Sequence, residues 1–249
     1  MSGPFSRTER LIGAEALQKL QRSRVAVFGI GGVGGYAVEA LARSGIGALD
    51  LVDSDRVALS NLNRQILATH ATVGMRKVDA ARERIAQINP DCIVRCYPVF
   101  FLPETKADFD FSAYDYIVDA VDTVSAKLAL VMAAEEAGVP IISAMGAGNK
   151  MDAAAFTVAD IYETSVCPLA RIMRKLCREH GIKSLKVVYS REEVKEPEAR
   201  PEDAEELAGT GRRAIPGSNA FVPGTAGLIL AGEVVKDLIG ERSAAWKKE

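Results

Sequence analysis

The first half of the chain alternates short apolar runs with segments in which apolar residues recur every three or four positions. Runs of the first kind predict strands, and segments of the second kind predict helices. The predicted strands cover residues 25–28, 48–52, 92–99, 116–121 and 139–143, and the predicted helices cover 33–43, about 78–88 and 123–137. Strands that alternate with helices pair in parallel through right-handed crossovers. We therefore expect an α/β fold with a doubly wound, mostly parallel sheet, whose Rossmann-like half covers residues 1–150.

The pattern is less regular after residue 150. Residues 154–158 and 185–189 are predicted strands, and residues 167–179 and 228–239 are predicted helices; the first helix places Leu169, Ile172, Met173 and Leu176 on one apolar face. Residues 191–206 carry eight acidic and three basic side chains, which predicts a mobile surface loop. No repeat divides the chain. We expect one domain over residues 1–249, in which residues 151–249 form an irregular, substrate-facing extension.

Composition excludes several classes of protein. The 249 residues are 48% hydrophobic and 26% charged, as in ordered globular chains. A net charge of −2 argues against general coating of nucleic acid but permits a local basic patch. Two histidines, and four cysteines without a C-x-x-C pair, disfavour histidine chemistry and structural zinc. The chain opens without a signal-like segment, and its longest uncharged run contains two prolines and four glycines. We expect a cytoplasmic protein without a membrane partner.

A glycine-rich loop lies between the first predicted strand and its helix. Gly29, Gly31, Gly32 and Gly34 would let the backbone approach a phosphate at the helix N-terminus. Asp53 closes the next strand, where its carboxylate can accept hydrogen bonds from ribose hydroxyls. This pairing predicts an adenosine or dinucleotide site and does not choose between NAD and ATP.

Charged residues beyond Asp53 favour ATP. ATP carries about four negative charges, and the release of pyrophosphate leaves charge that Arg64 and Lys77 could neutralise. Asp119 and Asp122 lie at the end of another strand, with Asp119 expected within or beside the strand itself. Asp122 is then better placed to bind Mg²⁺, which prefers carboxylate oxygen.

Five motifs in this order resemble those of the ubiquitin-activating-enzyme-like (ThiF-type) adenylyltransferases. They cover residues 29–34, 53–55, 60–65, 73–77 and 88–91. The resemblance implies adenylation of a carboxylate, with catalytic roles for Arg64, Lys77 and Asp122. It also implies a homodimer in which Arg10 reaches the partner's ATP. The residues implied to bind ATP are the four glycines above with Asp53, Asp55, Asn61, Arg64, Gln65, Lys77 and Asp122.

Further segments resemble one branch of this family. The branch that activates sulfur carriers usually has two C-x-x-C pairs, which this chain lacks. Residues 5–13, 43–47, 146–152 and 168–170 instead resemble the branch that dehydrates threonylcarbamoyladenosine in tRNA. That resemblance implies adenylation of the threonyl carboxylate, after which an internal nucleophile displaces AMP and closes a ring.

A basic stripe supports a nucleic-acid substrate independently. Arg171, Arg174, Lys175 and Arg178 recur at helical spacing, opposite the apolar face, and Lys183 and Lys186 extend the stripe. Such a stripe can neutralise several tRNA phosphates. An ordinary solvated helix face is the alternative.

Two other functions remain open. One is adenylation of the C-terminal glycine of a small sulfur-carrier protein, with a sulfur-transfer or cysteine-desulfurase partner; Thr123, where such relatives commonly have asparagine, weakens it. The other is an NAD-binding oxidoreductase or redox-sensing module. Cys92, Cys96, Cys167 and Cys177 are interpreted as buried or bystander thiols.

Overall fold

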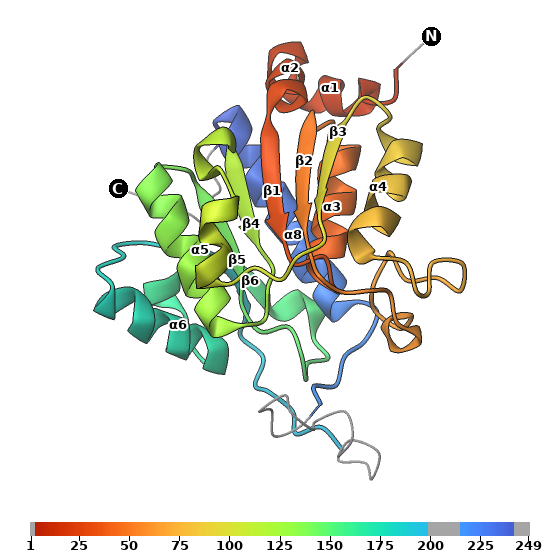
Figure 1. Cartoon of the computed structure of the whole chain (residues 1–249). Helices are drawn as coiled ribbons and strands as arrows, with labels where there is room; N and C mark the ends of the chain where they lie inside the picture. The colour runs from red at the N-terminus through yellow and green to blue at the C-terminus, as the bar shows by residue number, and fades with distance from the viewer. Residues whose placement is uncertain (1–2, 199–214, 242–249) are drawn as a thin grey trace.

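The molecule is built around a seven-stranded sheet with the strand order β3-β2-β1-β4-β5-β7-β6 (Figure 1). The computed structural model describes residues 3–198 and 215–241. The strands are β1 (Arg24–Phe28), β2 (Ala48–Val52), β3 (Ile93–Tyr97), β4 (Tyr116–Asp119), β5 (Ile141–Ala144), β6 (Phe156–Asp160) and β7 (Lys186–Ser190). Neighbouring strands run parallel except β6, which lies antiparallel to β7 at one edge. The doubly wound, mostly parallel α/β fold is confirmed, and the sheet takes strands from both halves of the chain.

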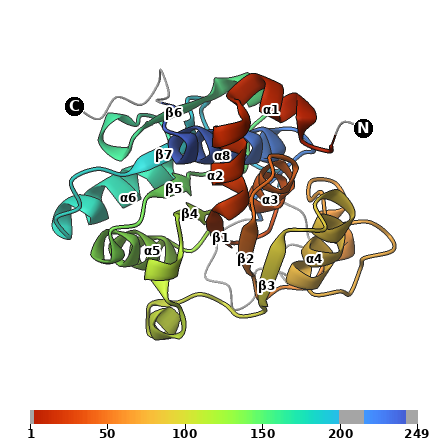
Figure 2. The same ribbon diagram turned by 90° about the horizontal axis from the view of Figure 1, so that it is seen from above.

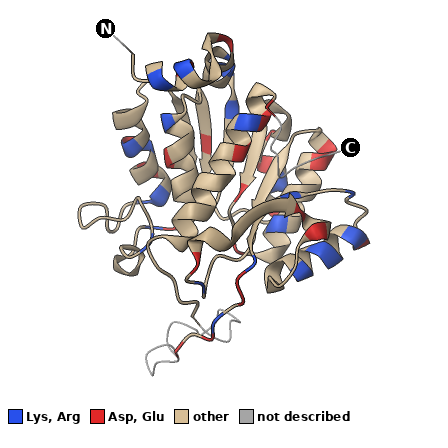
Figure 3. Cartoon of the chain, turned by 180° about the vertical axis from the view of Figure 1, so that it is seen from behind, with Lys and Arg blue, Asp and Glu red and all other residues tan. Residues whose placement is uncertain are grey.

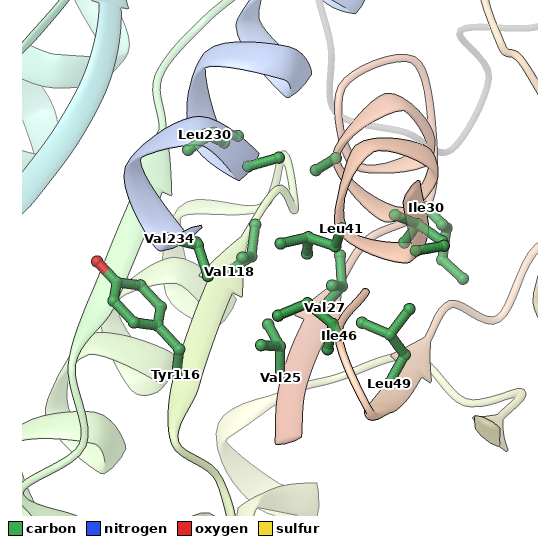
Figure 4. Close-up of a cluster of buried hydrophobic side chains, with 14 of the residues drawn as sticks. Val25, Val27, Ile30, Leu41, Ile46, Leu49, Tyr116, Val118, Leu230 and Val234 are labelled. Carbon is green, nitrogen blue, oxygen red and sulfur yellow. The ribbon is translucent and has the colours of Figure 1, made fainter. Parts of the chain in front are cut away.

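Helices cover both faces of the sheet (Figure 2). Apolar residues of α3, α4 and α8 pack on one face, and those of α5 and α6 pack on the other. Val25 and Val27 of β1, Leu41 of α3 and Leu230 of α8 belong to one buried cluster between the sheet and these helices (Figure 4). The helices are α1 (Ser6–Ile12), α2 (Ala14–Arg22), α3 (Gly34–Arg43), α4 (Lys77–Ile88), α5 (Val124–Ala137), α6 (Pro168–Glu179) and α8 (Val222–Ile239). Short 3₁₀ turns connect them, at Leu59–Asn61, Pro103–Asp108, Phe111–Ala113, Ala153–Ala155 and Ile161–Glu163.

Two details of the second half differ from the sequence prediction, and a third is only partly described. The last helix begins at Val222 rather than at residue 228, because Pro223 fits a first helical turn and the Asn219 side chain accepts from the Val222 N–H at 2.9 Å. Ile172 is 47% exposed, since α6 packs through Ala170, Met173 and Cys177 instead. Residues 199–206 of the predicted acidic loop lie outside the described residues.

Glycines bring α8 against α3. A Cβ on Gly227 would collide with the Val33 carbonyl, and one on Gly224 would lie 3.1 Å from the Tyr36 ring. The two helices therefore approach at backbone distance. This packing places the N-terminus of α8 beside the glycine-rich loop that precedes α3.

Candidate functional site

The carboxyl ends of β1, β2 and β4 meet at one edge of the sheet, the lower edge in Figure 1. Gly29 follows β1, Asp53 follows β2, and Asp119 is the last residue of β4. Parallel pairing of these three strands fixes this juxtaposition. Open α/β sheets bind their ligands at this edge.

The four glycines of the loop have two different roles. Gly29 has a left-handed φ of 82°, and a Cβ there would lie 2.7 Å from the Ala120 carbonyl oxygen; a Cβ on Gly34 would collide with the Gly29 carbonyl. These two glycines are required by the turn and by packing. By contrast, a Cβ on Gly31 would find only the Gln65 amide within 4 Å, at 3.8 Å. Gly31 therefore leaves backbone that a phosphate can approach, whereas a Cβ on Gly32 would lie 3.3 Å from Pro223 Cβ, so Gly32 also permits the close approach of α8.

Asp53 is held between the glycine loop and the start of α4. Its Oδ2 accepts from the Ile30 N–H at 2.7 Å, and its Oδ1 accepts from the Asp55 N–H at 2.9 Å. Lys77, the first residue of α4, is buried, with its ammonium 2.7 Å from Asp55 Oδ2 and 3.6 Å from Asp53 Oδ1. The structure thus brings together a cation and two carboxylates that the sequence separates by more than twenty residues.

The segment after β2 lies over the glycine loop. Arg64 is half-buried; a Cβ on Gly32 would lie 3.7 Å from its Cγ, and its guanidinium donates to the Ser60 carbonyl at 2.9 Å. Asn61 is buried, and its Oδ1 accepts from the Ala58 N–H at 3.1 Å. This bond fixes the turn that carries Arg64.

Gln65 supplies an unsatisfied polar atom at this place. Its side chain is buried, and its Oε1 accepts no hydrogen bond within the described part of the chain. A buried acceptor without a donor is costly. Its amide lies beside Gly31, so the unsatisfied acceptor adjoins the loop where a nucleotide is expected, and a ribose hydroxyl or an adenine amino group would satisfy it.

The β4–α5 turn presents Asp122. Asp119 is fully buried at the strand end, as predicted, with its Oδ2 2.9 Å from the equally buried ammonium of Lys127. Its Oδ1 accepts from the Val121 N–H at 3.2 Å. The pair orders the turn from within, while Asp122 is exposed at the start of α5. No group of three or more His, Cys, Asp or Glu side chains that could hold a metal occurs within residues 3–198 and 215–241. A magnesium ion here would take Asp122 and phosphate oxygens as ligands, which is a usual arrangement for this ion.

Residues 215–223 connect the segment after β2 to the loop after β5, and the sequence pattern did not predict this connection. Asn63 donates to the Ser218 carbonyl at 3.2 Å. On the other side, the Gly217 N–H donates to Asn149 Oδ1 at 2.6 Å, and the Asn219 amide donates to the Lys150 carbonyl at 2.8 Å. The only sequence signal was the three asparagines, and asparagine is common in any loop.

The predicted basic stripe lies along the outer side of α6 (Figure 3). Arg171, Lys175 and Arg178 are exposed, whereas Arg174 is half-buried and donates to Thr164 Oγ1 at 2.6 Å. Arg178 also lies over the Tyr162 ring, with its Cζ 5.4 Å from the ring centroid.

Lys186 does not extend the stripe, and that part of the prediction is wrong. It is buried in β7, where its ammonium lies 2.7 Å from Glu233 and 2.9 Å from Asp237 of α8. Two carboxylates on the helix that covers this face offset the cost of burying the lysine. Lys183 is exposed at the turn after α6.

Arg10 lies on α1, at the edge of the sheet opposite the glycine loop (Figure 1). Its side chain is exposed. The fold does not bring Arg10 to the site of its own chain, so the predicted role in catalysis requires a second protomer.

Three cysteines have thiols that resist ionisation. Burial raises the pKa of Cys92 and of Cys177 to about 11, and burial also raises the pKa of Cys96. Cys167 is buried before α6. The interpretation of Cys92, Cys96 and Cys177 as bystander thiols agrees with these environments.

A cavity of about 1580 Å³ opens at the opposite edge of the sheet. It is lined by α2, by the amino ends of β4 and β7, and by the last turn of α8. Because ligands of such sheets bind at the carboxyl ends, this cavity is not the candidate site.

Comparison with known proteins decides the family. The model of the ThiF family matches residues 5–248. The chain belongs to the ThiF family. The resemblance inferred from the five sequence motifs is therefore confirmed.

The relatives of this ThiF-family chain include tRNA-modifying enzymes. A tRNA threonylcarbamoyladenosine dehydratase of Bacillus subtilis is 45% identical over 242 residues, or 94% of each chain. Crystal structures of the Escherichia coli tRNA N6-threonylcarbamoyladenosine dehydratase, TcdA, in complex with AMP and with ATP, have TM-scores of 0.85 and 0.84. Both are 33% identical and cover 95% of this chain and 94% of theirs.

Similarity to sulfur-transfer proteins is confined to a shorter segment. An adenylyltransferase and sulfurtransferase of the yeast Vanderwaltozyma polyspora is 41% identical over 142 residues, or 57% of this chain and 32% of that protein. Among the described residues of this chain, no helix has both the length and the apolar content needed to cross a membrane.

Proposed function

We propose that this chain is an ATP-dependent dehydratase that adenylates the carboxylate of threonylcarbamoyladenosine in tRNA and closes it into a ring. The observation that carries the proposal is the similarity to the Bacillus subtilis dehydratase over 94% of both chains. The geometry supports it, because the glycine loop, Asp53, Arg64 and Lys77 meet at one edge of the sheet. The complexes of TcdA with AMP and ATP support the nucleotide.

The residues at this edge have distinct roles in the proposed reaction. The Asp53 carboxylate accepts hydrogen bonds from the ribose hydroxyls, and the backbone at Gly31 and Gly32 faces the phosphates. The substrate carboxylate attacks the α-phosphorus, pyrophosphate leaves, and Arg64 and Lys77 neutralise the charge that develops on it. The internal nucleophile of the same modified base then displaces AMP, which carries away one carboxylate oxygen. The product has lost the elements of water, and no enzyme nucleophile is required.

Magnesium is part of this proposal. Bound by Asp122 and phosphate oxygens, the ion would offset the negative charge of the triphosphate. Asp55 would serve the site by holding the Lys77 ammonium, to which it lies at 2.7 Å. Asn61 would hold the turn that carries Arg64, and the Gln65 side-chain oxygen would accept a hydrogen bond from the nucleotide.

The tRNA backbone would contact the basic stripe on α6. Arg171, Lys175 and Arg178 are the exposed cations of the stripe, while Arg174 joins the helix to Thr164. Binding through such cations weakens as salt concentration rises. Residues 151–249 would then form the substrate-facing half of a single domain that works in the cytoplasm.

A homodimer completes the proposed site. Because Arg10 lies far from the glycine loop of its own chain, it would enter the partner's site, where a cation near the phosphates adds to Arg64 and Lys77. A sulfur-transfer or cysteine-desulfurase partner stays a prediction. Burial raises the pKa of the Cys177 thiol, which disfavours this thiol as a sulfur acceptor.

The direct test uses tRNA that carries the threonylcarbamoyl base. Incubation with ATP and Mg²⁺ should reduce the mass of that nucleoside by one water and release AMP and pyrophosphate. A nucleoside of unchanged mass would refute the proposal. Pyrophosphate exchange that needs a small carrier protein and ignores tRNA would support the sulfur-carrier alternative. Thermal stabilisation by NADH, without stabilisation by ATP and Mg²⁺, would support the NAD alternative.

A further inference from the structure

Four lysines are buried within residues 3–198 and 215–241, namely Lys77, Lys127, Lys150 and Lys186. Three of them form ion pairs: Lys77 with Asp53 and Asp55, Lys127 with Asp119, and Lys186 with Glu233 and Asp237. Burying an ammonium group is costly unless an anion accompanies it, and these pairs follow that rule.

Lys150 departs from the rule. It is 3% exposed, and its ammonium donates to the main-chain carbonyl of Glu192, a neutral acceptor. No carboxylate of the described residues forms an ion pair with it, although its charge, after the backbone N–H donors of Asp152 and Met151, helps to lower the pKa of the nearby Glu192 carboxylate. The Glu192 carboxylate instead accepts from the N–H groups of Met151 and Asp152, each at 2.8 Å. An ammonium has three donors, so Lys150 can bind an anion without losing its bond to Glu192.

Neighbouring segments fix the backbone around Lys150. Asn149 has a left-handed φ of 59°, which is unusual for a residue other than glycine. Its Oδ1 accepts from the Gly217 N–H, and its carbonyl accepts from the Lys195 N–H at 2.9 Å. The Lys150 carbonyl accepts from Asn219. Such conformations occur where the surroundings over-determine them, often at functional sites.

The position of Lys150 along the sheet edge suggests which anion it binds. Four neighbouring strands end at this edge in the order β2-β1-β4-β5. Asp53 follows β2, the glycine loop follows β1, Asp122 follows β4, and the loop that contains Lys150 follows β5. If Asp53 binds the ribose and the glycine loop binds the phosphates, the acyl group of an adenylate continues in the same direction, toward β5. The phosphates already have Arg64 and Lys77 near them.

We propose that Lys150 binds the carboxylate of the acyl substrate and so selects the threonylcarbamoyl base over unmodified adenosine. This inference rests on the proposed function. Lys150 is then a substrate-binding residue, and the energetic cost of its burial is offset when the substrate carboxylate arrives.

The first experiment separates this role from a structural one. Lys150→Met removes a buried charge and one hydrogen bond to the Glu192 carbonyl, but it leaves the Glu192 carboxylate on its two N–H donors, so its thermal unfolding midpoint should change little. Lys127→Met is the matched comparison, because it leaves Asp119 buried without its cation, and its midpoint should fall by more than about 5 °C. A fall of similar size in Lys150→Met would overturn the proposal.

The second experiment measures selection of the base, with the full chain and without ATP. The preference is the Kd for tRNA with unmodified adenosine divided by the Kd for tRNA with the threonylcarbamoyl base. This ratio should be about tenfold or more smaller in Lys150→Met than in the unmodified protein. Lys150→Arg should keep part of the preference because it keeps the charge. Lys19→Met, which removes an exposed cation from α2, should leave the preference intact.

The outcomes distinguish the remaining explanations. An unchanged preference in Lys150→Met would overturn the proposal, and so would an unmodified protein that dehydrates the base without preferring it in binding. Loss of thermal stabilisation by ATP, with the preference intact, would assign Lys150 to a nucleotide phosphate instead. An unmodified protein that neither prefers nor dehydrates the base would refute the proposed function itself.

Discussion

At the scale of single residues, the candidate site depends on charges held by short, specific contacts. Lys77 is buried, and its ion pairs with Asp53 and Asp55 hold its side chain in place. Arg64 is held by main-chain and side-chain oxygens of its own segment. Both side chains are therefore pre-positioned, and in the proposed reaction little reorganisation would be needed when charge develops on pyrophosphate.

Replacing either cation should reduce turnover more than it weakens substrate binding. We expect Lys77→Ala and Arg64→Ala each to lower kcat by about a hundredfold or more, with smaller changes in KM for ATP. Steady-state kinetics of AMP release would measure both constants. Arg22→Ala, which removes an exposed cation at the opposite edge, is the control and should match the unmodified enzyme. If both active-site variants kept full turnover, the phosphates would have to lie elsewhere.

At the scale of elements, the position of α8 organises the site. Its glycines allow contact with α3. Pro223 in its first turn lies beside Gly32, and Asn219, just before the helix, accepts a hydrogen bond from the Val222 N–H. The buried Lys186 joins the same helix to β7 through two carboxylates. The sequence periodicity predicted the helix but not its first six residues or the elements that it contacts, because those depend on which surfaces pack against it.

Two glycines of α8 offer a matched test of this packing. Gly227→Ala would place a methyl group against the Val33 carbonyl and should destabilise the fold by about 1–3 kcal/mol. Gly232→Ala meets no atom within 4 Å and should stabilise the helix by about 0.5–1 kcal/mol. Urea unfolding of both variants would measure the difference. Equal effects would mean that α8 does not approach α3 at backbone distance.

The contact between α8 and β7 should also depend on pH. Although burial opposes ionisation, hydrogen bonds from Lys186 and Lys236 hold the pKa of Glu233 below its usual value. A carboxylate whose pKa is lowered by folding contributes stability above its unfolded pKa of about 4.3, and this contribution is lost as pH falls through the folded pKa.

Glu233→Gln should therefore cost most near neutral pH. We expect a loss on the order of 2 kcal/mol at pH 7, and a difference from the unmodified protein that shrinks as the pH falls below about 4. Urea unfolding at several pH values would measure it. A difference that stayed constant across this range would show that the charge of Glu233 does not support the fold.

At the scale of the whole molecule, Arg10 and the glycine loop lie at opposite edges of the sheet. Helix α1, which carries Arg10, is at the amino-terminal edge, and the glycine loop is at the carboxyl edge (Figure 1). A dimer in which α1 of one protomer reaches the other's site would make two sites, each with residues from both chains.

Mixing two inactive variants tests this arrangement. Arg10→Ala and Lys77→Ala should each be inactive alone, because every site lacks one cation. In an equal mixture of exchanging dimers, half are mixed dimers with one intact site, so about a quarter of full activity should return. AMP release after mixing would measure it. If Arg10 acted in its own chain, mixing would restore no activity.

The residues at the carboxyl edge could be predicted from the sequence alone. Each glycine, Asp53, Lys77 and Asp122 lies next to a strand or helix end, and parallel strands bring their carboxyl ends together whatever the rest of the chain does. The folded structure was needed to show that β6 runs antiparallel, that Lys186 is buried, that residues 215–223 join the two sides of the site, and that Lys150 forms no ion pair with a described carboxylate. These features depend on which distant side chains face one another across packed elements, and local spacing carries no record of that.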